Sequence, residues 1–155
     1  MDTDELTQRI PPEIVADLVS LAWQTFVGTE LIPVETGGPV DADQMVSSAI
    51  SIGGPWAATV VFHCSMTVAR IGAATVLGME PAEMEDSDVL DIVGELANII
   101  GGNVKGFVSD ADSEWSLSLP VVSEGMQLVP GSRLATEVAF LCEGEPISCE
   151  VREHA

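Results

Sequence analysis

The stretch that decides the fold reads DIVGELANIIGGN and covers residues 91–103. Apolar residues occupy most sides of the helix that this stretch would form, and four other positions are spaced 4, 3 and 4 apart. Positions with that spacing lie in one row along a single helix face. The sequence therefore predicts a mostly buried helix that shows only a narrow row to the solvent. This row consists of Gly102 and three polar residues, Asp91, Glu95 and Asn98, which we call the polar row.

The helix that carries the polar row is expected to start near residues 86–88, whose acidic side chains suit a helix N-terminus, and to reach about Val108. Gly94, Gly101 and Gly102 lie in its interior, where each glycine costs roughly 0.5–1 kcal/mol relative to alanine. Glycines at such a cost in helix stability suggest a structural or functional reason. Two reasons stay open: close packing of the helix on a sheet, or close approach of a partner's backbone.

Two further helices are expected earlier in the chain. Residues 12–27 carry apolar side chains at helical spacing, with proline in the first turn and Gly28 just past the end. Ser65 is a suitable N-cap for a helix that continues to about Leu77, where Gly78 and then Pro81 stop it.

The remaining apolar segments have the patterns of strands joined by turn-forming residues, with hairpins across residues 53–55 and 143–146. Helices followed by strands thus occur twice. This order predicts one α+β domain over residues 1–155, with two related helix-then-strands halves and a mostly antiparallel sheet packed against long helices. The expected extended segments are residues 31–34, 44–52, 56–63, a strand from Trp115 with Leu117 and Leu119 on its buried face, 126–129, 134–142 and 147–151.

The order of elements also suggests a weak internal duplication. An alignment with an offset of 75 residues places Ser20 opposite Glu95. It places Trp23 opposite Asn98, so that only the second half keeps its acid and its amide.

The chain is strongly acidic: 25 Asp and Glu residues against 5 Lys and Arg give a formal net charge of -20. Such a surface repels polyanions, so binding to nucleic acid or anionic lipid is not expected, and a partner with a basic face fits better. Residues 1–5 lack the features of a secretion signal, and no apolar run reaches the ~18 residues of a membrane span. Since the three cysteines form no C-x-x-C pair and suit a reducing compartment, we expect a cytoplasmic protein.

Several kinds of site have no support in the sequence. No G-x-x-x-x-G-K-[ST] phosphate loop is present, and His63 and Cys64 lack a second ligand pair at metal spacing, so no metal site is expected. A Ser-His-Asp triad is unsupported too, because the two histidines lie at the end of an expected strand and at position 154. The polar row can instead orient a water molecule through Asn98 and hold a partner's lysine or arginine through Glu95.

Residues 91–103 resemble the E-x-x-N-x-x-x-G signature helix of the CheC/CheX family of chemotaxis phosphatases, most closely its CheX-like branch. Fainter similarity extends over the leading helix, the hairpin before the second helix and residues 119–122. The resemblance implies an α+β fold of two related halves. It also implies dephosphorylation of a phospho-aspartyl response regulator, such as the chemotaxis regulator CheY.

By the same resemblance, Asn98 would position the hydrolytic water beside the phospho-aspartate, and Glu95 would pair with a lysine of the regulator. Asp91, Gly94 and Gly102 would contact the partner. The magnesium ion of the reaction would belong to the regulator, with no cofactor in this chain. Members of the CheX-like branch have one motif per chain and commonly pair, so a homodimer is expected.

Other interpretations stay open beside a phosphatase. In one, the polar row is a solvated helix face and Asn98 bonds a nearby loop. In another, the chain is a non-catalytic adaptor that binds a receiver domain or a flagellar-switch protein through the same surface. In a third, it is a dimerisation domain in which the polar row has no role.

Overall fold

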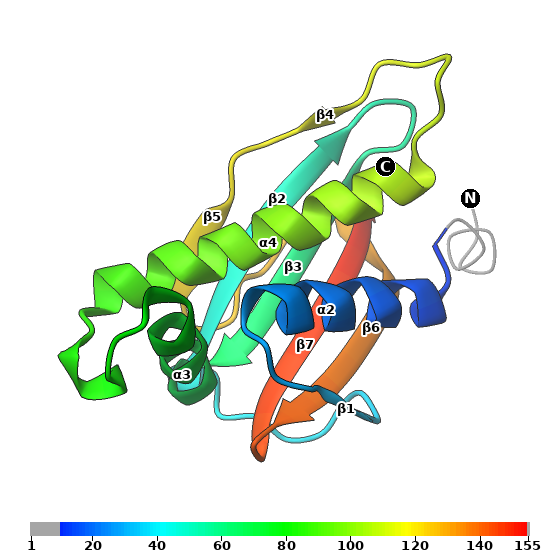
Figure 1. Ribbon diagram of the computed structural model, residues 1–155. Helices are drawn as coiled ribbons and strands as arrows, with labels where there is room; N and C mark the ends of the chain where they lie inside the picture. Colours follow the sequence, from blue (N-terminus) through cyan, green and yellow to red (C-terminus); the bar gives the residue numbers. More distant parts are fainter. Residues whose placement is uncertain (1–9, 155) are drawn as a thin grey trace.

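The computed structural model describes residues 10–154, which form three α-helices, two 3-10 helices and seven strands (Figure 1). Residues 1–5, on which the expectation about a secretion signal rests, lie outside this part. The helices are α2 (Pro12–Phe26), α3 (Met66–Leu77), α4 (Asp86–Val108) and the 3-10 helices Ala42–Gln44 and Pro81–Glu83. The strands are β1 (Ile32–Val34), β2 (Met45–Gly53), β3 (Ala58–Ser65), β4 (Ser116–Leu117), β5 (Val121–Glu124), β6 (Ser132–Cys142) and β7 (Glu145–His154).

The seven strands of residues 10–154 form one antiparallel sheet in the order β1-β6-β7-β3-β2, with β4 and β5 both paired to β2. Helices α2 and α4 lie across one face of this sheet, with α4 over β2 and β3 and α2 over β6 (Figure 1). We call this face the helical face and the other the open face. The arrangement confirms the predicted α+β fold with an antiparallel sheet packed against long helices.

The start of α4 is fixed by two sets of contacts. Glu85 and Asp88 cap each other's backbone N–H groups in a capping box, which satisfies donors that a helix leaves free. Arg70 of α3 donates to the carbonyl of Met84 at 2.8 Å and forms an ion pair with Asp86. Helix α3 therefore holds the first turn of α4 in place.

Two interior glycines allow α4 to approach the sheet closely. A Cβ atom on Gly101 would lie 2.4 Å from Cγ2 of Ile50 in β2. A Cβ atom on Gly94 would lie 3.0 Å from Cγ2 of Val122 in β5. Interiors are already close-packed, so side chains at these two positions would overlap their neighbours. Close helix-to-sheet packing therefore explains both glycines.

Gly101→Ala is expected to lower the free energy of unfolding by about 1–3 kcal/mol, because the added methyl group overlaps the fully buried Ile50. Gly106→Ala is the matched control, since a Cβ added there would meet no atom within 4 Å apart from the helix's own neighbouring backbone. That change should stabilise the protein by roughly 0.5–1 kcal/mol, as alanine is the better helix former. Urea unfolding measures the free energy of unfolding of both variants. An equal change in the two would show that the approach of α4 to β2 does not require glycine.

The strand expected from Trp115 is mostly wrong. Strand β4 has only two residues, and Leu119 is 86% exposed instead of lying on a buried face. The regular alternation of the sequence predicted a half-buried strand, but the regular pairing with β2 ends at Leu117, Ser118 still bonds to Ser51, and the pairing resumes only at β5. Trp115 and Leu117 are half-buried against the core, as the alternation predicted, but Leu119 lies beyond the cover of α4 and is exposed.

The strand expected at residues 126–129 is also wrong. Residues 125–131 cross the open face of the sheet on the way from β5 to β6, and we call this segment the 125–131 crossing. The Gln127 side chain holds the crossing in place, since it donates to the carbonyls of Ser47 at 3.1 Å and Val121 at 2.8 Å. A short apolar run that covers a sheet has the same composition as a strand, so the sequence pattern did not separate the two.

Candidate functional site

The polar row lies on the side of α4 that faces away from the sheet. Asp91, Glu95 and Asn98 are all exposed, and Gly102 at the end of the row is half-buried. The residues beside Asn98 and Glu95 in the sequence, Leu96 and Ala97, are buried in the core. The structure thus brings the three predicted polar residues together on one exposed face of a helix that is otherwise packed.

The polar groups of Asp91, Glu95 and Asn98 are not used by the rest of the described chain. Within residues 10–154, no hydrogen bond or ion pair engages Asp91, Glu95 or Asn98. The alternative in which Asn98 bonds a nearby loop therefore has no support in the structure. Both the carboxamide of Asn98 and the carboxylate of Glu95 keep their full capacity for a partner.

Acidic side chains dominate the first half of α4. Asp86 and Asp88 lie in its first turn, and Asp91 and Glu95 follow on the exposed side. The basic residue of the last turn, Lys105, lies more than two turns beyond Glu95. Carboxylates grouped in this way favour a cationic group on whatever docks against the helix.

Gly94 does not belong to the exposed surface, although it was predicted to contact a partner. It is buried, and a Cβ atom added to it would point at Pro120 and Val122. Its place is explained by the packing of α4 on β5. At Gly102, in contrast, the nearest atom to an added Cβ would be Cδ2 of Leu117 at 3.9 Å, which leaves room at the surface.

The family model "Chemotaxis phosphatase CheX" matches residues 46–141, which include all of α4 and make up more than half of the chain. The chain belongs to the CheX family. Among proteins with curated descriptions, none matches this sequence.

Solved structures with the same fold include CheX proteins and a FliM middle domain. CheX from Vibrio vulnificus superposes with a TM-score of 0.72 at 19% identity, over 94% of this chain and 96% of that one. The CheX–CheY–BeF3–Mg complex from Borrelia burgdorferi gives 0.74 at 18% identity, over 92% and 97%. The FliM middle domain from H. pylori gives 0.64 at 11% identity, over 99% and 94%. At these identities the likeness establishes the fold.

The burial pattern of α2 corrects the internal alignment of this CheX-family chain. Trp23, which the sequence alignment placed opposite Asn98, is 1% exposed and belongs to the core. With an offset of 74 residues, the buried and exposed positions of the two helices coincide almost throughout. That offset places two exposed residues, Leu21 and Gln24, opposite Glu95 and Asn98. Helix α2 thus keeps the geometry of α4 but has a leucine in the place of the acid.

A buried polar cluster on the open face was missed by the sequence reasoning. Ser47 of β2, His63 of β3 and Glu150 of β7 meet there: Ser47 Oγ lies 2.7 Å from His63 Nδ1, and His63 Nε2 lies 2.9 Å from Glu150 Oε2. Arg152 donates to the other carboxylate oxygen of Glu150 at 3.2 Å. The hydrogen bond from His63 lowers the pKa of Glu150, and the charges of His63 and Arg152 act in the same direction against the effect of burial.

The arrangement has the residue types of a catalytic triad but not its chemistry. Ser47 is fully buried, and its hydroxyl donates to the carbonyl of Gly125 in the 125–131 crossing at 2.7 Å. A serine has only one proton, so Ser47 Oγ accepts the hydrogen bond from Nδ1 of His63, while Nε2 of the same ring contacts the carboxylate of Glu150. His63 thus links β2, β3 and β7 through its two ring nitrogens. Ser47 is not a nucleophile.

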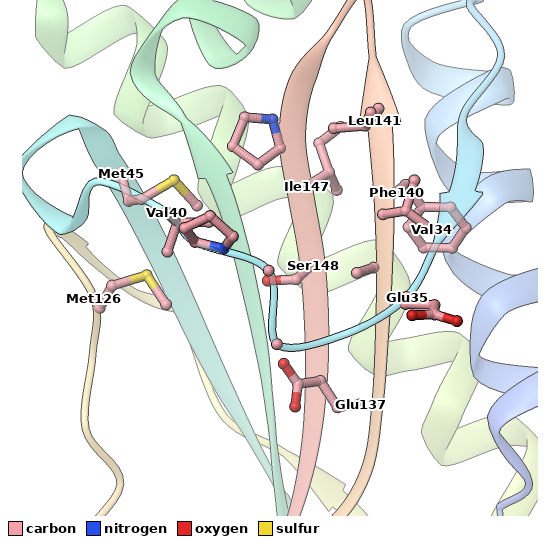
Figure 2. Close-up of a pocket in the computed structure, with 15 residues that line it drawn as sticks. Val34, Glu35, Val40, Met45, Met126, Glu137, Phe140, Leu141, Ile147 and Ser148 are labelled. Carbon is pink, nitrogen blue, oxygen red and sulfur yellow. The ribbon is translucent and has the colours of Figure 1, made fainter.

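A pocket of about 180 Å³ lies on the open face, where the loop of residues 35–40 crosses in front of β6 and β7 (Figure 2). Its lining is mostly apolar and includes Val40, Met45 and Met126, with the carboxylates of Glu35 and Glu137 beside it. The sheet separates this pocket from the polar row. It therefore takes no part in the candidate site.

Three further observations concern residues 10–154 as a whole. None of their helices is both long and apolar enough to cross a membrane. No group of three or more His, Cys, Asp or Glu side chains among them is arranged to hold a metal ion. Cys64, Cys142 and Cys149 are free and buried, and burial raises the pKa of the Cys149 thiol to about 12.

Proposed function

We propose that this CheX-family chain hydrolyses the aspartyl phosphate of a response regulator's receiver domain. The observation that carries the proposal is the exposed, uncommitted pair Glu95 and Asn98 on the helix that the family model spans. The Borrelia burgdorferi CheX, which shares the fold, was solved in a complex with CheY, BeF3 and Mg. That complex supports a receiver domain as the class of partner.

The proposed reaction is a simple hydrolysis. The oxygen of a water molecule bonds to phosphorus while the bond between phosphorus and the aspartate oxygen breaks, which releases inorganic phosphate and a free carboxylate. The carboxamide oxygen of Asn98 accepts a hydrogen bond from this water, and its NH2 group donates to a phosphoryl oxygen. The water is thereby held in line with the bond that breaks. Because an amide does not titrate near neutral pH, Asn98 orients the water and does not remove its proton.

Glu95 is proposed to hold the receiver in place. Its carboxylate lies one helical turn from Asn98 and matches a lysine or arginine on the partner. Asp91 and the acids at the start of α4 extend the negative surface, and Gly102 leaves space at the other end of the row. The magnesium ion, which would neutralise phosphoryl charge, is proposed to belong to the receiver domain.

A rigid helix is a suitable support for such a pair. The first turn of α4 is fixed by Arg70, and the close contact of Gly101 with Ile50 sets its distance from β2. A side chain on a packed helix is held more accurately than one on a loop. Asn98 therefore enters the partner's site in a position that the fold has already set.

Glu95→Lys is expected to weaken binding of the phosphorylated receiver roughly tenfold or more, because attraction to a basic group becomes like-charge repulsion. Glu114→Lys makes the same change in net charge at an exposed residue beside the β2–β3 turn and should leave affinity nearly unchanged. Titration of a fluorescently labelled receiver measures both. If the two variants weaken binding equally, the effect is one of net charge and Glu95 is not an anchor.

Assembly and location are part of the same proposal. Since each chain has one polar row, we propose a homodimer that offers two rows, in the cytoplasm where receiver domains are found. Light scattering with mass determination tests the dimer, and a monomer at micromolar concentration would exclude it.

The function itself is tested by the lifetime of the phosphoryl group on isolated receiver domains, with and without this chain. A shortened lifetime is the expected result. A receiver that binds while its phosphoryl lifetime stays unchanged would favour the adaptor function instead.

A further inference from the structure

Leu119 lies beside the turn of α4 that carries Asn98. On one side of it in the sequence, Leu117 lies 3.6 Å from the position of a Cβ on Gly101. On the other side, Pro120 lies 3.7 Å from the position of a Cβ on Gly94. The segment between β4 and β5 thus runs along α4 in the opposite direction, and its midpoint passes the turn between these two glycines. That midpoint is Leu119, whose side chain is 86% exposed.

The backbone around Leu119 is held firmly. The N–H of Ser118 donates to the carbonyl of Ser51 at 2.9 Å, and Ser118 Oγ accepts the N–H of Ser51 at 2.9 Å. The hydroxyl of Ser118 donates to the carbonyl of Leu119 at 3.0 Å. Pro120 follows with a restricted φ angle and packs against α4. The fold therefore presents an apolar side chain to solvent at a fixed place next to the polar row.

We propose that Leu119 docks against an apolar surface of the receiver domain while Asn98 engages its phosphorylated aspartate and Glu95 pairs with its lysine or arginine. This inference rests on the proposed function and adds a determinant of partner choice to it. The docking face is continuous: Leu119 forms its apolar side and the acids of α4 form its charged side. The matching receiver has an apolar patch on one side of its phosphorylated aspartate and a lysine or arginine on the other.

Leu119 is expected to set affinity, whereas Asn98 sets turnover. The contact of Leu119 with an apolar patch is the same in the docked complex and in the transition state. It therefore strengthens binding of the receiver without changing the rate of hydrolysis at saturation. A leucine on a fixed backbone also loses little conformational freedom when it is covered, which makes the contact favourable. A receiver without the apolar patch lacks this contact with Leu119, so it is released more readily before Asn98 can act.

The experiment uses the whole chain and the receiver domains of the same genome, phosphorylated in the presence of Mg²⁺. Leu119→Ser should raise the receiver concentration needed for half-maximal rate about tenfold and leave the rate at saturation within about twofold. Leu119→Met, which keeps an apolar side chain of similar size, should restore the wild-type value. Leu128→Ser is the control, because Leu128 is 89% exposed but belongs to the 125–131 crossing on the open face.

The outcomes separate this inference from the proposed function. An unchanged half-saturation value for Leu119→Ser, or an equal change for Leu128→Ser, overturns the docking role while the phosphatase function stands. A loss confined to the rate at saturation overturns it as well. If the wild-type protein accelerates hydrolysis on no receiver, its binding to receivers activated with BeF3 and Mg²⁺ is measured instead. Weaker binding of Leu119→Ser than of wild type supports the docking role without catalysis. No binding by wild type overturns both the docking role and the phosphatase function.

Discussion

Asn98→Ala is expected to reduce the stimulated hydrolysis of the receiver's phosphoryl group by about 100-fold or more, because the water loses the group that orients it. Binding of the receiver should change little, since Glu95 and Leu119 remain. The fold should be unaffected too, because Asn98 is exposed and makes no hydrogen bond within residues 10–154. Single-turnover kinetics at saturating protein, together with a binding titration, separate the two effects.

Asn103→Ala is the matched control for this experiment. Asn103 is a second asparagine on α4, but it lies outside the polar row. Its replacement should leave the rate of hydrolysis within about twofold of wild type. An Asn98→Ala protein that still accelerates hydrolysis like wild type would remove Asn98 from the mechanism, whatever the family of the chain.

Glu150→Ala is expected to lower the free energy of unfolding at pH 7 by about 3 kcal/mol, because it removes the carboxylate that pairs with both the buried His63 ring and the Arg152 guanidinium. This value is at the lower end of the range for buried ion pairs, since the Glu150 side chain is 19% exposed. Glu137→Ala is the control. Glu137 lies opposite Glu150 across β6 and β7, so its removal takes away a like charge and should cost little or nothing.

The pH dependence of the same variant follows from the lowered pKa of Glu150. A carboxyl whose pKa is lower in the folded state contributes stability above its unfolded value, about 4.3, and loses it as the pH falls through the folded value. The gap in stability between wild type and Glu150→Ala should therefore narrow as the pH is lowered below about 4.3. Urea unfolding at pH 7, 5 and 3.5 measures this, and a gap that stays constant across that range would contradict the ion pair.

The helices and the polar row could be predicted from the sequence because their signals are local. Ser65 caps α3 by accepting the N–H of Val68, and Gly78, with φ of +67°, ends it, as their residue types indicate. The exposure of Glu95 and Asn98 followed from spacing on one helix. The role of Gly94 was less clear, since a glycine that serves packing and one that serves a partner have the same sequence.

The open face of the sheet could not be predicted, because it depends on contacts between distant segments. His63 and Glu150 are 87 residues apart in the sequence and meet only through the pairing of β3 with β7. A turn at residues 53–55 would place Ser47 opposite Val61, whereas β2 and β3 are joined by the longer turn 54–57, which places Ser47 opposite His63. Their burial depends on the 125–131 crossing, for which the apolar pattern predicted a strand.

The proposed function requires that this chain act on the aspartyl phosphate of a receiver domain through Asn98. Its most direct test is the decay of radiolabelled phosphoryl groups on all receiver domains of the same genome, with wild-type protein, with Asn98→Ala and with no addition. At least one receiver is expected to lose its label faster with the wild-type protein only. Equal decay in all three conditions for every receiver, or equal acceleration by wild type and Asn98→Ala, would contradict it.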